Sequence, residues 1–475
     1  MLFSSTLFLF AFLPIVLSLY FLLPGVRARN ALLLVASLLF YAWGEPLYVL
    51  LLLSSIGLNF TLGRLVRGNP EKNERGVLAL AIGLNLGLLA VFKYANFVVE
   101  NLDWLFALFA LPPIELAPIP LPIGISFFTF QAITYVVDIH RGEAEAQVNP
   151  GRVGLYIALF PQLIAGPIVR YREIAAALKE RTSRLEDVAE GAQRFIIGLA
   201  KKVLVADALA VPVDRIFAIP ADELTMSVAW LGLIAFSFQI YFDFSGYSDM
   251  AIGLGRCFGF RFPENFNWPY TSSSLREFWR RWHITLSSFF RDYLYIPMGG
   301  NRLGPTRTAF NLMTVFLLCG LWHGASWTFV IWGLIHGAFL AAERTRFGTW
   351  IEASPTFIQR TYVLAVVFLA WTFFRTPDIA HGWDYLTALV QTSPPLSQAF
   401  PLALYLDTHL MTVLAIACLS LTKVTERLWQ STRTWPAKAD VSLEWTRSVT
   451  LLLTLALCAM SISASTHNPF IYFRF

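Results

Sequence analysis

The sequence predicts an all-α, polytopic membrane protein that forms a single domain over residues 1–475. Three observations support this prediction. Hydrophobic residues make up 56% of the chain and charged residues only 14%, which is too apolar for a soluble protein of 475 residues. Apolar stretches of membrane-helix length recur along the chain. The basic residues behind the net charge of +5 lie in short segments between these stretches, as membrane topology requires and nucleic-acid binding does not.

The amino-terminal part is expected to contain both regular and broken spans. A stretch over 31–66 is cut by Gly44, Glu45 and Pro46, and proline lacks the N–H that continues a helix, so we expect two short helices there. The stretch 153–169 also contains prolines and a glycine, and we expect a re-entrant piece that is buried against protein. The regular spans expected in this part are 7–23, 77–98 and 123–139.

Charged and amphipathic segments follow in the middle of the chain. Residues 171–190 are rich in charge and predict one cytoplasmic helix, while 195–219 are amphipathic around Lys201 and Lys202 and favour the membrane interface. We expect about eight to twelve membrane segments, several of them irregular. Irregular backbone at membrane depth needs protein or water to satisfy its hydrogen-bonding groups, so these segments predict an interior cavity. The later regular spans are expected at 227–244, 360–374, 403–422 and 449–465.

A single histidine, His323, stands between two strongly apolar stretches. The preceding run, 309–322, is 14 residues long, or roughly 21 Å of helix, which is shorter than the roughly 30 Å hydrocarbon core. Basic residues before the first stretch and after the second predict a hairpin whose two arms begin and end in the cytoplasm. His323 near its tip is a functional candidate, since ionisable residues at membrane depth are costly; the alternative is a histidine hydrogen-bonded to a neighbouring helix.

Residues 275–291 follow a helical period. Apolar and aromatic side chains form one face, and Arg276, Arg280, His283 and Arg291 belong to a polar stripe on the other. A functional helix of this kind would turn its arginines toward the phosphates of an activated donor and His283 toward the reactive centre. The alternative is an ordinary amphipathic helix that binds anionic lipid.

Together, His283 and His323 offer two imidazoles that can accept a proton from a hydroxyl nucleophile at neutral pH. The histidines and cysteines lack metal-ligand spacing, so we expect no metal site, and His336 is not expected to share a helix face with His323. Asp243 and Asp249 are expected to pair with arginine rather than act as acids. Phosphate-binding-loop and nucleophile-elbow patterns are absent from the sequence, which weakens kinase and soluble-hydrolase interpretations.

Seven stretches carry a recognisable pattern: residues 121–131, 160–168, 243–249, 266–270, 278–284, 292–302 and 320–324. Each is weak alone, but as a set they resemble the membrane-bound O-acyltransferase family, and in particular its bacterial alginate O-acetyltransferase-like branch. The resemblance covers most of the chain up to about residue 345. It implies a ring of transmembrane and re-entrant helices around a thinned centre that a tunnel crosses.

The resemblance also implies roles for individual residues. His323 matches the principal catalytic histidine of the family, and His283 matches its second active-site histidine. The accompanying candidates for substrate binding are Arg276, Arg280, Arg291, Trp282 and Trp322.

The resemblance fits the polysaccharide-acetylating members best. It implies an acetyltransferase of the bacterial inner membrane that takes acetyl groups from a cytoplasmic thioester, acetyl-CoA, for O-acetylation of an exported or cell-wall polysaccharide such as alginate or cellulose. We expect no bound cofactor and no nucleic acid, and we expect extracytoplasmic acetyltransferase proteins as partners, with 376–401 as a candidate docking segment. Two alternatives stay open: transfer of D-alanine from a carrier protein to teichoic acid, and a transporter or flippase in which His323 relays protons.

Overall fold

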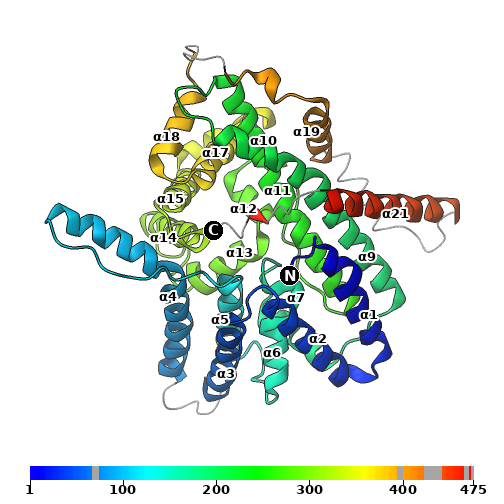
Figure 1. The fold of residues 1–475 in the computed structure, drawn as a ribbon. Helices are drawn as coiled ribbons and strands as arrows, with labels where there is room; N and C mark the ends of the chain where they lie inside the picture. Colours follow the sequence, from blue (N-terminus) through cyan, green and yellow to red (C-terminus); the bar gives the residue numbers. More distant parts are fainter. Residues whose placement is uncertain (67–73, 393–398, 422–440, 465–469, 472–475) are drawn as a thin grey trace. The chain divides into compact units, whose positions relative to one another are not determined.

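The computed structural model describes residues 1–66, 74–392, 399–421, 441–464 and 470–471. Every regular element in these ranges is a helix (Figure 1), which confirms the predicted all-helical class. Within them, six helices are long and apolar enough to cross a membrane, as a polytopic membrane protein requires. They are α2 (Gly25–Ala42), α3 (Tyr48–Val66), α4 (Glu74–Leu108), α11 (Met226–Cys257), α17 (Thr356–Arg375) and α21 (Val441–Ala464).

The helices form two compact units that are discontinuous in the sequence. Unit 1 comprises Met1–Phe195 and Ser248–Pro263, and unit 2 comprises Ile196–Tyr247 and Glu264–Phe475. Two of the three boundaries fall inside α9 (Leu185–Ala200) and α11, where no linker composition can mark them, and the third lies between Pro263 and Glu264, after the end of α11. The single domain expected over 1–475 stays a prediction.

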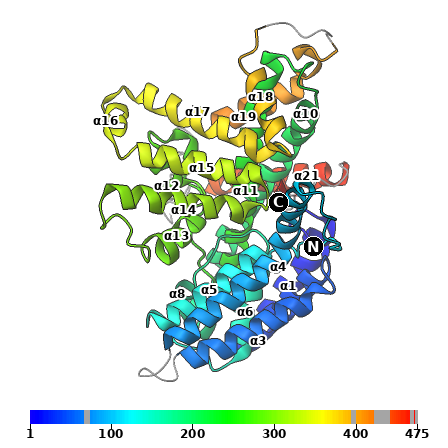
Figure 2. The same cartoon turned by 90° about the vertical axis from the view of Figure 1, so that its left-hand side faces the viewer.

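In unit 1, α3, α4 and α5 (Ile125–His140) pack side by side (Figure 2). All residues of α5 from Ile125 to Ile139 are buried, so this helix lies in the core of the unit. The expected break near Gly44 is confirmed, because α2 ends at Ala42 and α3 begins at Tyr48, but the expectation of two short helices is wrong, because both are long enough to cross a membrane. The remaining helices of this unit are α1 (Leu13–Leu22), α6 (Pro150–Ala158), α7 (Phe160–Leu163) and α8 (Tyr171–Lys179).

The broken segment expected over 153–169 is confirmed by the short helices α6 and α7. This segment contacts the start of α5, where Gly124 has a left-handed backbone conformation with φ +77°. A Cβ on Gly124 would lie 2.9 Å from the carbonyl oxygen of Leu163, so this close approach requires glycine. Two of the seven recognised stretches, 121–131 and 160–168, therefore meet at this point.

The single charged helix predicted over 171–190 is wrong. Helix α8 ends at Lys179 and α9 begins at Leu185, with extended backbone at Glu180. The chain leaves the helix where Arg181 turns its guanidinium toward neighbouring segments of unit 1: Nε donates to the carbonyl oxygen of Phe258 at 2.9 Å and Nη1 to Asn30 Oδ1 at 2.6 Å. Local charge patterning cannot foresee such distant partners.

The amphipathic stretch expected over 195–219 also differs from the prediction. The chain passes from α9 through a π-helical turn, Lys201–Ala206, into α10 (Asp207–Phe217). Lys202 does not face a membrane interface, because it is only 3% exposed and its Nζ pairs with Asp207 at 2.6 Å and Asp243 at 2.8 Å. Paired carboxylates offset the cost of burying this ammonium group.

Unit 2 is built on the hairpin of α14 (Pro305–His323) and α15 (Trp327–Ala342), which pack closely along their length (Figures 1 and 2). Cβ atoms added to Gly320 and Gly333 would overlap the carbonyl oxygens of Phe329 and Phe316, so the two backbones touch directly. The other α-helices described in this unit include α10, the part of α11 up to Tyr247, α12 (Leu275–Arg281), α13 (Ile284–Phe290), α16 (Arg346–Ala353), α17, α18 (Ile379–Ala388), α19 (Thr408–Ser420) and α21.

Replacement of Gly320 or Gly333 by alanine should force α14 and α15 apart. Overpacking against backbone costs about 1–3 kcal/mol, so we expect a clearly lower unfolding temperature for Gly320→Ala and Gly333→Ala in detergent-solubilised protein. Gly83→Ala is the matched control, because no atom lies within 4 Å of its added Cβ and alanine is the better helix former. Equal unfolding temperatures for all three variants would contradict the close packing.

Candidate active site

The sequence predicted one continuous helix over 275–291, and this prediction is wrong. Helix α12 ends at Arg281 and α13 begins at Ile284. Between them His283 has φ +43° and ψ 54°, the left-handed region that a residue with a Cβ rarely adopts. His283 therefore leaves the predicted polar stripe and turns into the interior of unit 2.

The imidazole of His283 is fully buried, with an exposed fraction of 0%. Its ring lies edge-on to Phe244 with a centroid distance of 4.6 Å and lies 5.9 Å from the ring of Trp322. Nδ1 is 3.1 Å from Asn265 Oδ1. Burial lowers the pKa of His283 to about 3, so the ring is neutral at physiological pH. Among the described residues, Nε2 has no hydrogen-bond partner.

His323 is the last residue of α14, at the tip of the α14–α15 hairpin, as the sequence predicted. Its side chain is 4% exposed and is surrounded by aromatic rings. The ring centroids of Trp322, Trp332 and Phe374 lie 5.0, 5.0 and 5.2 Å away, all close to edge-on. Because Trp322 contacts both His323 and His283, the structure brings the two predicted histidines to one site.

The same aromatic cluster includes His336, which the sequence analysis had set apart. Trp332 lies 5.0 Å from His323 and 5.0 Å from His336, between ring centroids. The argument from helix faces assumed an uninterrupted helix, whereas the chain turns between α14 and α15. His336 Nδ1 lies 3.4 Å from Trp279 Nε1, whose N–H donates to it.

A cavity of about 330 Å³ lies in unit 2. Three predicted substrate-binding residues, Arg276, Arg280 and Arg291, line it, as does Arg344, which the sequence analysis did not select. Arg344 follows the apolar stretch of α15 and looked like an ordinary topology signal. The other lining residues include apolar side chains of α14, namely Leu312, Val315, Phe316 and Cys319.

The cavity approaches both histidines without including them in its described lining. Cys319 precedes His323 by one turn of α14, about 6 Å along the axis, and Ile284 directly follows His283. The two predicted tryptophans are not lining residues either. Trp322 lies between the histidines, and Trp282 is 1% exposed within an aromatic cluster.

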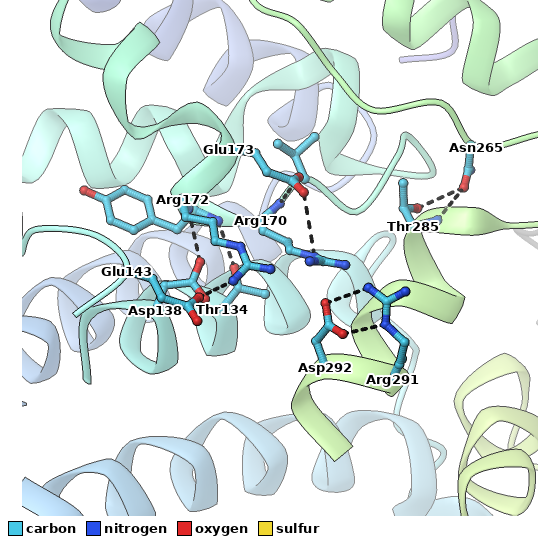
Figure 3. Close-up of polar contacts among 12 residues, drawn as sticks. Thr134, Asp138, Glu143, Arg170, Arg172, Glu173, Asn265, Thr285, Arg291 and Asp292 are labelled. Atoms are coloured by element: carbon cyan, nitrogen blue, oxygen red, sulfur yellow. Dashed lines mark hydrogen bonds and ion pairs between the residues drawn. The ribbon is translucent and has the colours of Figure 1, made fainter. Parts of the chain in front are cut away.

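The arginines of the cavity differ in their pairing. Arg291 pairs with Asp292 at 2.6 Å (Figure 3), and Arg276 reaches Glu352 only at 3.9 Å on the surface. In the part of the chain that the structure describes, neither Arg280 nor Arg344 has an ion-pair partner. Both side chains are exposed, and they give the cavity lining positive charge without an ion-pair partner among the described residues.

Two buried carboxylates of α11 form ion pairs. In unit 1, Asp249 accepts from Arg194 at 2.8 Å, which confirms the expected arginine partner. In unit 2, Asp243 pairs with Lys202 instead, and its Oδ2 also accepts the backbone N–H of Ile471 at 2.7 Å. Over the described residues, no group of three or more His, Cys, Asp or Glu side chains is arranged to hold a metal ion.

Comparison with known proteins gives a consistent assignment. The model of the membrane-bound O-acyltransferase family matches residues 125–380. The probable alginate O-acetylase of Pseudomonas putida is 42% identical over the full length of both chains. The peptidoglycan O-acetyltransferase of Helicobacter pylori is 35% identical over 100% of this chain and 98% of its own. The teichoic acid D-alanyltransferase of Bacillus subtilis is 28% identical over 46% of this chain and 58% of its own.

The family match spans both histidines, the cavity and the α14–α15 hairpin. The chain is therefore an O-acyltransferase that belongs to the membrane-bound O-acyltransferase family.

Proposed function

We propose that this protein moves acetyl groups from acetyl-CoA, on the cytoplasmic side of the bacterial inner membrane, for O-acetylation of an exported or cell-wall polysaccharide of the alginate type. The observation that carries the proposal is the full-length similarity to relatives named for O-acetylation of alginate and of peptidoglycan. Transfer of D-alanine to teichoic acid is less well supported, because that relative is 28% identical and matches only 46% of this chain.

The cavity beside α14 supports a donor with a charged end and an acylated arm. Its volume of about 330 Å³ lies within the range of small-ligand pockets. Arg280 and Arg344 supply positive charge without ion-pair partners among the described residues, which suits the phosphates of coenzyme A. Apolar side chains of α14 suit the arm that carries the thioester toward His323.

His323 is proposed as the general base. Its neutral imidazole takes the proton of the acceptor hydroxyl while the hydroxyl oxygen attacks the thioester carbonyl carbon. A C–O bond forms, the C–S bond breaks, and the proton passes to the departing sulfur to give the free thiol of coenzyme A. The rings of Trp322, Trp332 and Phe374 around His323 limit access of water, which would otherwise hydrolyse the thioester.

Extracytoplasmic acetyltransferase proteins are the proposed partners that pass acetyl groups on to the polymer. The candidate docking segment over 376–401 contains α18, and its part from 393 to 398 lies outside the described residues.

Loss of His323 should abolish thioester consumption. For purified His323→Ala assayed with radiolabelled acetyl-CoA, the extracytoplasmic partner proteins and an oligosaccharide acceptor, we expect thiol release and label transfer to fall by about 100-fold or more, because general-base catalysis contributes that much. The wild-type protein is the reference, and the unfolding temperature of the variant shows whether it folds. Acetyl transfer at the wild-type rate by folded His323→Ala would contradict the mechanism. Substrate movement without thioester cleavage by the wild-type protein would favour the transporter alternative.

Removal of Arg280 or Arg344 should weaken donor binding. We expect Arg280→Ala and Arg344→Ala each to raise KM for acetyl-CoA about tenfold with little change in kcat, since a charge-assisted hydrogen bond contributes about 1.5–3 kcal/mol. Arg346→Ala is the matched control, because Arg346 is exposed nearby and does not line the cavity.

The arginine variants have an internal check. With an acetyl thioester of N-acetylcysteamine, which carries no phosphate, the variants and the wild type should have equal KM values. A similar loss with this short donor would show that the arginines do not act on the phosphates.

A further inference from the structure

The side chain of Asn265 holds the segment that carries His283. Asn265 is fully buried, and its Oδ1 lies 3.1 Å from His283 Nδ1. The same oxygen lies 3.2 Å from the backbone nitrogen of Thr285 and 2.9 Å from Thr285 Oγ1 (Figure 3). Its own carbonyl oxygen accepts the N–H of Ile284 at 3.0 Å. One residue therefore contacts three consecutive positions at the kink between α12 and α13.

These contacts fix which end of the Asn265 amide faces His283. A backbone N–H can only donate, so the amide atom opposite the nitrogen of Thr285 must be the oxygen. A flipped amide would place its NH₂ group 3.2 Å from another donor. The same oxygen faces Nδ1 of His283, and a carbonyl oxygen can only accept. Nδ1 must therefore carry the proton.

The protonation state of the second ring nitrogen follows from the first. Burial lowers the pKa of His283 to about 3, so the ring holds a single proton. With that proton on Nδ1, Nε2 presents a bare lone pair. Nε2 is buried and has no partner among the described residues, so it is ready to accept a hydrogen bond from a substrate hydroxyl or amide N–H.

The backbone at His283 supports a functional constraint rather than simple packing. A left-handed conformation in a residue with a Cβ is strained and persists only where the surroundings enforce it. Here the enforcing contacts are the two hydrogen bonds from the Ile284 and Thr285 N–H groups to Asn265. This backbone conformation places the imidazole of His283 within hydrogen-bonding distance of the amide oxygen of Asn265.

We propose that Asn265 is a positioning residue that holds His283 as its Nδ1–H tautomer and thereby directs a bare Nε2 toward the substrates. The catalytic consequence rests on the proposed acetyl transfer, whereas the tautomer itself does not. Related catalytic histidines are commonly oriented by the group that binds their second nitrogen.

The tautomer can be measured directly. Full-length protein labelled with ¹⁵N-histidine in lipid nanodiscs gives separate ¹⁵N resonances for protonated and bare ring nitrogens, and the His283→Asn variant identifies the signals of His283. At pH 7.5 we expect Nδ1 to be protonated and Nε2 to be bare. A proton on Nε2 of His283 in the wild-type protein would overturn the proposal.

Substitutions of Asn265 separate positioning from folding. Asn265→Leu removes the acceptor, and we expect kcat to fall about 100-fold while KM for acetyl-CoA changes less than about twofold, because the arginines still hold the phosphates. Asn265→Asp keeps an acceptor for all three donors and should retain much of the activity. The proposal is wrong if Asn265→Asp is as inactive as Asn265→Leu although it folds.

The aspartate variant should also change the pH profile. Among the described residues, the groups that face the ring of His283 are Phe244, Trp322 and Asn265, and none of them is charged. Burial is the cause of the lowered pKa of His283. A carboxylate at 265 would stabilise the imidazolium and raise the pKa of His283. A protonated ring cannot accept a hydrogen bond. As the pH falls, Asn265→Asp should therefore lose activity at a higher pH than the wild-type protein does.

Asn267→Asp is the matched control, because Asn267 is exposed two residues away, and its profile should equal that of the wild type. An unshifted profile in Asn265→Asp contradicts the proposal. If the ¹⁵N signals show the expected tautomer but the wild-type protein transfers no acetyl groups, the proposed function fails while the tautomer assignment holds.

Discussion

The site in unit 2 depends on direct backbone contact between α14 and α15. At Gly320 and Gly333 there is no room for a Cβ, so the two helices approach each other at the distance of their own carbonyl groups. This approach brings Trp332 of α15 within ring contact of His323 at the end of α14. Glu343, just beyond α15, then accepts the N–H groups of Leu275 and Arg276 at 2.6 and 3.1 Å and so fixes the start of α12.

Burial without ionisation is the second constraint on this site. A charged imidazole among aromatic rings would lose its hydration without a compensating partner, so a histidine in such a place is stable chiefly as the neutral ring. The permanent charges of unit 2 follow a different rule. Lys202 is buried against two carboxylates, and the cavity arginines are exposed or half-buried, so ionised groups lie where ions or water surround them. Neutral imidazoles and paired ions therefore occupy different environments within the same unit.

Much of the fold could be predicted from the sequence, because the signals involved are local. Apolar runs located the six long helices, whereas the spans expected at 7–23, 123–139 and 403–422 form helices shorter than the candidate spans. The proline after Gly44 located the break between α2 and α3, and the two apolar stretches around His323 located the hairpin tip. The misplaced elements have a common physical cause. The kink at His283 depends on Asn265, and the break after Lys179 depends on contacts of Arg181 with Asn30 and Phe258, all distant in sequence.

The candidate site shows the same division between local and distant causes. Arg276, Arg280 and Arg291 could be selected because they recur at helical spacing, and they line one cavity although the helix between them is broken. Arg344 also lines this cavity, because α15 packs against α14 in the hairpin. The spacing of residues within 275–291 carries no information about that packing. Asn265 lies outside the predicted helix altogether and gave no charge or periodicity signal.

The separation of charge from the imidazoles has a consequence for how the reaction can be organised. In the proposed reaction, a donor held by its phosphates at the arginines need not bring any charge to the histidines, because apolar side chains of α14 line the same cavity and neither histidine is among its lining residues. In that proposal the reacting end meets His323 and the neutral ring of His283, both of which contact Trp322. In the proposed mechanism, the aromatic rings around His323 limit access of water, so the acceptor hydroxyl is the group that gives its proton to this base. Exclusion of water would therefore couple proton transfer to acyl transfer in the proposed reaction.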